Sequence, residues 1–247
     1  MERMWLDVPF AEKEAAKKAG ARWDPDEMRW WVTSSKAEHV QKWLPADPLP
    51  ETFPGEDRQF GEGLFVDLVP QSSWFTNART CIAQTDWQRV RRVVIFRAGK
   101  RCEVCQRRAE PAVRLWLEVH ERWAYDDAER VQALRRLICL CSACHLSTHY
   151  GFARVTGREE EAREHLAKIR REQGLELASH VGAAMDLWQM RSRYSWALDL
   201  RILTEAGVEL RTPPPGTKIY RPKPPVTPKP AERPARRRLW QRLLGSA

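Results

Sequence analysis

Two pairs of cysteines in the middle of the chain have the spacing of a metal site. Each pair is a Cys-x-x-Cys unit, Cys102 with Cys105 in "CEVC" and Cys141 with Cys144 in "CSAC", and thirty-five residues separate the pairs. Two short loops that each present two thiolates form a tetrahedral ligand set, which suits Zn²⁺ without any redox chemistry. We therefore predict one structural zinc ion on these four cysteines. The alternative, that the side chains merely pack in a core, is disfavoured by the paired spacing.

Histidines gather around the second cysteine pair. The stretch "LCSACHLSTHYG" places His145 and His149 four residues apart directly after the cysteines, and "LWLEVHERW" supplies His120 twenty residues ahead of that stretch. Residues at i and i+4 share one face of a helix. These histidines can hold a second divalent cation, and each can equally be an ordinary structural or surface residue.

The remaining cysteines and histidines lack partners at metal-binding spacing. Cys81 and Cys139 stand alone, and an isolated cysteine is usually a small buried residue. His39, His165 and His180 lie in charged stretches with helical spacing. We expect all five to be structural.

Two strands and a helix must position the candidate ligands. The stretch "VRLWLEVH" alternates in polarity, which predicts a half-buried strand with Glu118 and His120 on the same face. We expect "LRRLICLC" to form a second strand and Ser142 to begin a helix. Upstream, "TDWQRVRRVVIFRAG" has apolar residues at helical spacing and ends at Gly99. These elements predict a β-β-α unit clasped by zinc.

The chain divides into four parts, whose elements predict an α+β fold. Residues 1–45 form a small Trp-rich module with a helix over Ala11–Ala19, and the Pro-, Glu- and Gly-rich residues 46–63 form a linker. Residues 64–211 form the zinc domain, with two further helices in "REEEAREHLAKIRRE" and "HVGAAMDLWQMRSRYSWALDLRILTEAG". Residues 212–247 hold nine of the seventeen prolines and predict a disordered tail.

The net charge of +9 is concentrated in that tail. Residues 211–242 contain ten Lys or Arg and one acid, so residues 1–210 are neutral overall. Within the neutral part, residues 79–108 contain nine basic and two acidic residues. Such local bias suits the phosphates of nucleic acid, and it equally suits a solvated helix face. We predict DNA as the partner, and a protein partner through the tail as a further option.

The cysteine content and the apolar pattern bear on location. Six cysteines without an N-terminal apolar run predict a reducing, cytoplasmic setting, in which paired cysteines hold metal more often than they form disulfides. No segment approaches about 20 continuous apolar residues, which excludes a membrane span.

The first module carries five tryptophans in its 45 residues. Tryptophans can stack on bases, but in so small a module we expect them mainly to form the core. The stretch "LDVPFAEKEAAKKAGARWDPDEMRWWV" resembles a small uncharacterised domain that recurs in plasmid and phage DNA-processing proteins. The resemblance implies a role in DNA processing and no particular chemistry.

The second domain resembles the HNH nuclease superfamily, in a phage and bacterial branch, over about residues 70–205. The matching stretches are "VHERWAYDD" and "LCSACHLSTHYG", flanked by "SSWFTNAR" and by Trp188–Leu200. The resemblance implies a β-β-α metal fold in which Mg²⁺ or Mn²⁺ stabilises the leaving 3′ oxygen while a histidine deprotonates water. It places His120 on the strand and His149 as the helix ligand, with His145 as a second ligand or a packing residue.

Two features depart from the family pattern. Active members usually carry His-His or Asp-His on the first strand, whereas this chain has His120-Glu121. Either His120 is the ligand and Glu121 the base, or His120 is the base and the cation loses a ligand. The asparagine expected before the second strand is also missing, because positions 135 and 136 are both arginine. A carboxylate from Glu118 or Glu121 can compensate.

Two hypotheses follow. The first is an HNH-type endonuclease that acts on DNA phosphodiester bonds through His120, Glu121 and His149, with a structural zinc and a second metal on the histidines. The second is a catalytically degenerate HNH-fold zinc protein that binds nucleic acid or a protein partner. The retained histidines favour the first, and the two departures favour the second. A weaker third hypothesis makes the body an adaptor that the tail recruits to a larger complex.

Overall fold

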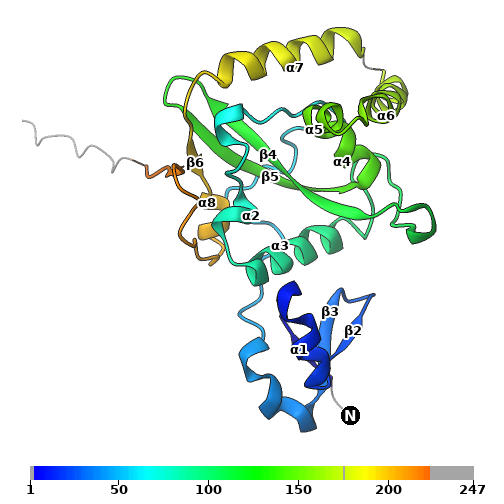
Figure 1. The fold of residues 1–247 in the computed structure, drawn as a ribbon, viewed down its shortest axis with the longest axis vertical. Coiled ribbons are helices and arrows are strands. Elements are labelled where there is room, and N and C mark those ends of the chain that lie inside the picture. The colour runs from blue at the N-terminus through cyan, green and yellow to red at the C-terminus, as the bar shows by residue number, and fades with distance from the viewer. Residues whose placement is uncertain (1–2, 175, 223–247) are drawn as a thin grey trace, which may run out of the picture.

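The computed structural model describes residues 3–174 and 176–222 of the chain (Figure 1). The fold is α+β, as predicted from the sequence. Most of the predicted tail, including its closing "LWQRLL", lies outside the described residues. Within the described ranges, no helix combines the length and the apolar content needed to cross a bilayer.

The N-terminal module is a three-stranded antiparallel sheet covered on one face. The strands run in the order β1 (Arg3–Leu6), β3 (Arg29–Thr33) and β2 (Arg22–Asp24). A 3₁₀ turn over Phe10–Glu12 leads into α1 (Lys13–Lys18), and a 3₁₀ helix spans Ser34–Trp43. Gly20, with φ of +91°, follows α1 and takes the left-handed conformation that glycine adopts most easily. The module's core contains Leu6, Val8, Ala16, Ala21, Val32, Val40 and Trp43.

The prediction that the tryptophans form this core is wrong for most of them. Trp43 is buried, whereas Trp23 is 47% exposed. Trp5 and Trp31 pair across β1 and β3 and, by strand alternation, point to the face opposite Val32. Small aliphatic side chains fill the core instead, because only one face of the sheet is covered by helix.

The larger part of the chain is built on the long antiparallel hairpin of β4 (Leu117–Asp126) and β5 (Val131–Cys141). Short strands β6 (Ala197–Asp199) and β7 (Lys218–Ile219) extend the sheet in parallel, in the order β4-β5-β6-β7. Figure 1 shows α3 on one side of the hairpin and α4 to α7 on the other. The helices are α2 (Ala78–Cys81), α3 (Gln84–Arg97), α4 (Ser142–Thr148), α5 (Tyr150–Val155), α6 (Glu159–Glu172), α7 (Ala178–Arg191) and α8 (Arg201–Thr204), with 3₁₀ turns at Gln71–Ser73 and Pro111–Val113.

Strand β5 is buried on both faces, which explains its almost unbroken apolar end. Leu137 and Cys139 pack in the cluster around α3, whereas Ile138 and Leu140 pack in the cluster that contains the zinc-ligand candidates. A continuous apolar run is the usual composition of a strand covered on both sides. The hairpin thereby joins the two clusters.

The segment predicted as a linker packs on the second domain from Phe53 onward. Phe53 is 1% exposed in the cluster around α3. The side chains of Glu56 and Arg97 are both fully buried, and each guanidinium Nη donates to one carboxylate oxygen at 2.6 Å. Glu56 also accepts the backbone N–H of Leu137 at 2.9 Å. This stretch is therefore anchored to both α3 and β5.

The N-terminal module is attached to α3 through one carboxylate. Asp7 lies 3.2 Å from Arg29 of its own module and 3.2 Å from Arg92 of α3. Arg89 of α3 lies 4.0 Å from Asp7 and donates to the backbone oxygen of Asp47. These contacts tie the module to the face of α3 that is turned away from the hairpin.

Candidate metal centres

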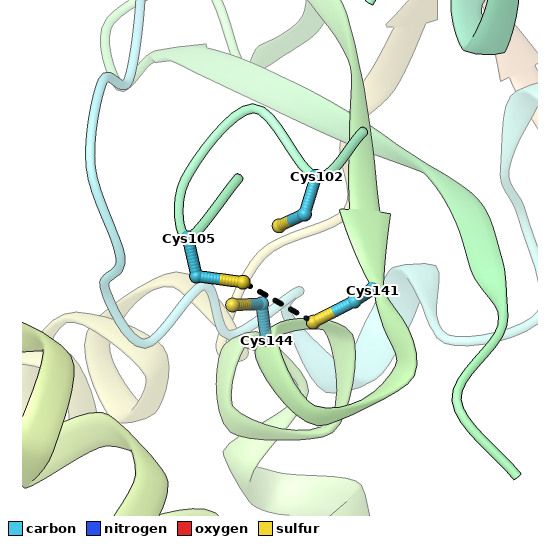
Figure 2. A group of neighbouring side chains, drawn as sticks. All are labelled: Cys102, Cys105, Cys141 and Cys144. Carbon is cyan, nitrogen blue, oxygen red and sulfur yellow. Dashed lines mark hydrogen bonds between the residues drawn. The ribbon is translucent and has the colours of Figure 1, made fainter. Parts of the chain in front are cut away.

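The four paired cysteines meet at one point (Figure 2). Cys102 and Cys105 lie in the loop after α3, Cys141 ends β5, and Cys144 lies in the first turn of α4. Their sulfur atoms all lie within 4.8 Å of one another, and Cys105 Sγ is 3.6 Å from Cys141 Sγ. A tetrahedral Zn²⁺ with bonds of about 2.3 Å requires sulfur–sulfur distances of about 3.8 Å. The four side chains fit such an ion.

Electrostatics within this cluster favour a bound dication. Hydrogen bonds from the thiols of Cys105 and Cys141 lower the pKa of Cys102, whereas the interaction with Cys102 raises the pKa of Cys141 and of Cys144. Crowded thiols therefore do not all ionise by themselves. A dication among them favours the thiolate form of each.

Side chains around the cluster hold its two halves together. Glu103 lies inside the first Cys-x-x-Cys unit, and its carboxylate accepts the Cys139 N–H and the guanidinium of Arg136, each at 2.8 Å. His165 of α6 places Nε2 3.2 Å from Cys144 Sγ. No local sequence pattern indicates that contact, because α6 reaches the cluster only in the folded chain.

The structure also brings His120, His145 and His149 together, at a second position beside α4. Their candidate ligand nitrogens lie within 4.8 Å of one another. His120 Nδ1 is 3.1 Å from His149 Nε2. Two nitrogens bound to one ion at about 2.1 Å are separated by about 3.0–3.4 Å, so this pair fits a shared cation.

The helix that carries two of these histidines ends earlier than the sequence predicts. Helix α4 stops at Thr148, and His149, with φ of −83° and ψ of 48°, forms the junction to α5. The N–H of His149 still donates to the oxygen of His145 at 3.0 Å, so the two histidines stay one turn apart. The break turns the chain into α5 directly at the candidate ligand.

Two buried charged residues that the sequence analysis missed support His120. Asp67 Oδ2 lies 3.3 Å from His120 Nε2 and 3.3 Å from Arg122 Nη1. Arg122 is fully buried, and its guanidinium lies 3.8 Å from the centre of the Phe65 ring. Burial raises the pKa of Asp67, and Arg122 opposes that rise. An acid within the apolar stretch "FVDLVP" was the available sequence signal for Asp67.

Burial keeps two of the histidines neutral. It lowers the pKa of both His120 and His149, and the positive charge of Arg122 lowers that of His120 further. Neutral imidazole is the form that binds metals. Glu118, on the same face of β4 as His120, lies 3.1 Å from His145 Nδ1 and adds a carboxylate beside the cluster.

The structure does not bring Glu121 to the histidines, which corrects the prediction that it acts with them. Strand alternation points Glu121 to the opposite face of β4 from His120. Its carboxylate accepts the backbone N–H of Arg79 at 3.3 Å, at the start of α2. Among the carboxylates of β4, Glu118 lies on the histidine side.

The residues expected to be structural differ in their surroundings. Cys81 and Cys139 are completely buried in the cluster around α3. His180 Nε2 accepts the backbone N–H of Val66 at 2.9 Å, whereas His39 is exposed. Of this set, His165 alone lies against a metal-ligand candidate.

Comparisons with known proteins find a family match and a similar relative, and the family match lies in the N-terminal module. Residues 3–45 match the family model described as a domain of unknown function, DUF5710. The chain is also similar to the DNA primase TraC of Escherichia coli, to which it is 33% identical over 66 residues. That match covers 26% of this chain and 6% of the primase, so the chain spans a small fraction of that relative. No solved structure matches the chain.

Proposed function

We propose that this protein hydrolyses phosphodiester bonds of DNA at an HNH-type site formed by His120, His145 and His149, beside a structural zinc on the four cysteines. The observation that carries the proposal is the 3.1 Å approach of His120 Nδ1 to His149 Nε2, from a strand and from the end of the helix that follows the hairpin. The order of hairpin, cysteines and helix is that of the superfamily which the sequence resembles. The similarity of the chain to a DNA primase supports DNA as the substrate.

The role of His120 follows from its contact with Asp67. Asp67 Oδ2 lies 3.3 Å from His120 Nε2. An ionised carboxylate can only accept a hydrogen bond, so an ionised Asp67 would select the tautomer with a proton on Nε2 and an unprotonated Nδ1. That nitrogen faces His149 and is free to bind a cation or to accept a proton from water. His145 and His149 supply the other nitrogen ligands. A divalent cation bound there supplies positive charge that stabilises the leaving 3′ oxygen.

The donor set bears on which metal binds. Three imidazoles suit transition-metal ions better than Mg²⁺, which prefers oxygen ligands. Glu118 is the neighbouring oxygen donor, 3.1 Å from His145 Nδ1. We therefore expect Mn²⁺, Co²⁺ or Ni²⁺ to support cleavage better than Mg²⁺ does.

A degenerate, non-catalytic scaffold is the second candidate, and one specific observation favours it. Arg136, one of two arginines where the family carries asparagine, donates to Glu103 at 2.8 Å and to the oxygen of Phe60 at 3.3 Å. This position therefore serves the zinc loop rather than the histidines. On this hypothesis the fold binds nucleic acid or a protein without cutting. The predicted protein contact through the tail falls largely outside the described residues.

The test is cleavage of supercoiled and linear DNA by zinc-loaded protein with Mg²⁺, Mn²⁺, Co²⁺ or Ni²⁺ added. We expect cutting by the wild type and by His39→Ala, an exposed control, and none by His120→Ala or His149→Ala. All four proteins should keep one zinc per chain. Equal cutting by His120→Ala would point to a contaminating nuclease or to another site. A zinc-loaded wild type that shifts DNA without cutting it would support the scaffold.

A further inference from the structure

Two of the stretches that flank the zinc domain pack on each other. The backbone N–H of Gln71 donates to Ser192 Oγ at 2.9 Å, and Ser72 Oγ donates to the oxygen of Tyr194 at 2.6 Å. The rings of Trp74 and Trp188 are stacked, with centroids 6.3 Å apart and planes 17° apart. These contacts fix the 3₁₀ turn at Gln71–Ser73 and Trp74 after it on the end of α7.

This packing leaves aromatic rings in solvent. Trp74 is 50% exposed, and Phe75 is 82% exposed, which makes Phe75 the most exposed large apolar side chain among the described residues. Trp188 is half-buried beneath Trp74. We call Trp74, Phe75 and Trp188 the aromatic ledge. An exposed phenylalanine that directly follows a stacked tryptophan adds no core packing to the chain, so the ledge calls for another explanation.

The ledge is connected at both ends to the strand that carries His120. On its N-terminal side, Asp67 lies 3.3 Å from His120 Nε2. On its C-terminal side, the N–H of Arg79 lies 3.3 Å from Glu121 Oε1. The ledge therefore belongs to a segment, residues 67–79, whose two ends are held by neighbouring residues of the strand that carries His120.

Free positive charge accompanies the aromatic rings. Arg79 and Arg193 are both exposed, and neither guanidinium has a hydrogen bond or ion pair within the part of the chain that the structure describes. Exposed aromatic rings beside unpaired arginines are the usual means of binding single-stranded nucleic acid, where bases stack and phosphates pair with cations.

We propose that the aromatic ledge stacks unpaired bases of single-stranded DNA and, with Arg79 and Arg193, delivers that strand to the histidine cluster. The delivery step rests on the proposed function, whereas the binding step does not. Paired bases in a duplex keep their faces stacked on one another, so a duplex cannot use the ledge in this way. The substrate of the site is accordingly a single strand or an unpaired region.

Binding is tested without any cutting, by fluorescence anisotropy of zinc-loaded protein with a labelled oligothymidine strand and no second metal added. We expect Phe75→Ala to weaken single-strand binding at least about fivefold, because a stacked base contributes enough for such a loss. Duplex binding should change less than twofold. Val113→Ala removes an apolar side chain elsewhere that is 60% exposed and should change neither. Arg79→Gln should weaken single-strand binding and reduce its salt dependence.

Other results would overturn the proposal. If Phe75→Ala binds the single strand as tightly as the wild type does, the ledge does not contribute to DNA binding. If Phe75→Ala weakens duplex binding by the same factor, the ledge does not prefer unpaired bases. If sedimentation showed that Phe75→Ala only converts a dimer to a monomer, the ledge would be a self-association surface. If the wild type never cuts DNA but Phe75→Ala still loses single-strand binding, the nuclease proposal is wrong and the ledge proposal stands.

Discussion

One oxygen atom of Asp67 lies 3.3 Å from both His120 Nε2 and Arg122 Nη1, so a single buried carboxylate serves an imidazole and a guanidinium at once. The arrangement couples the stability of the domain to the alignment of the candidate site. Among the described residues, Arg122 has no other carboxylate partner, and its other hydrogen bond goes to the oxygen of Gly63 at 3.3 Å.

Asp67→Asn should therefore cost both stability and activity. The free energy of unfolding should fall by about 3–5 kcal/mol, because the substitution leaves the Arg122 charge buried without a counter-ion. Any DNA cleavage should fall about 10- to 100-fold, as is usual when the partner of a metal-binding histidine is lost. Urea unfolding and single-turnover cleavage measure the two effects. Asp127→Asn breaks the more exposed pair with Arg191 and should cost less than about 1 kcal/mol. Equal losses in the two variants would refute the role of Asp67.

The cysteine cluster predicts a sharp contrast between two Cys→Ser variants. Cys105→Ser removes a ligand and should release zinc and unfold the β5–α4 region, because metal affinity there contributes directly to folding. Cys81→Ser alters a buried cysteine outside the cluster and should keep one zinc per chain. Atomic emission and limited proteolysis check both. A zinc-loaded, protease-resistant Cys105→Ser protein would contradict the four-cysteine site.

The ion pair of Glu56 and Arg97 predicts that a substitution in the segment expected to be a linker lowers the stability of the domain. Glu56→Gln leaves Arg97 buried and uncompensated, and should lower the free energy of unfolding by about 3–5 kcal/mol. Glu110→Gln, which breaks an exposed pair with Arg107, should change it by less than about 1 kcal/mol. Chemical denaturation of both variants gives the comparison. If Glu56→Gln is as stable as wild type, the segment does not contribute to the fold as described.

His180 predicts a loss of stability in acid. Burial lowers its pKa, as does Arg170 nearby, whereas Glu176 opposes the change. The unfolded chain, with an ordinary histidine pKa of about 6.5, takes up a proton before the folded chain does, so stability falls as pH drops below about 6.5. His180→Gln, whose amide oxygen can accept the Val66 N–H, should show a smaller drop in urea midpoint between about pH 7.5 and 5.5. An identical drop would mean that His180 does not contribute.

The parts of the fold that the sequence predicts best are those with local signals. Polarity alternation in "VRLWLEVH" correctly placed Glu118 and His120 on one face of a strand. Helical spacing predicted α3, with Trp87 and Val90 buried as expected. The Cys-x-x-Cys spacing predicted a cluster that the folded chain does bring together. In each case the pattern that supports the prediction lies within one short stretch of sequence.

The parts that escaped prediction depend on residues far apart in the chain. Asp67 meets Arg122 across 55 positions of sequence, and no local pattern indicates that these two residues pair. Helix α4 ends at Thr148, and neither of the two residues that follow is the glycine or proline that usually indicates a helix end. The exposure of Trp23 depends on which face of a small sheet the helices cover. Only tertiary contacts determine these features.

Helix α4 contributes a candidate ligand to each cluster, because Cys144 and His145 are consecutive residues within it. Metal binding at the two clusters should therefore be thermodynamically linked. Zinc that orders this turn would remove part of the entropy that the histidines lose on binding a second cation. By reciprocity, the second cation must tighten zinc by the same factor. A chelator that removes zinc should consequently lower affinity at the histidines as well, even though it touches none of them.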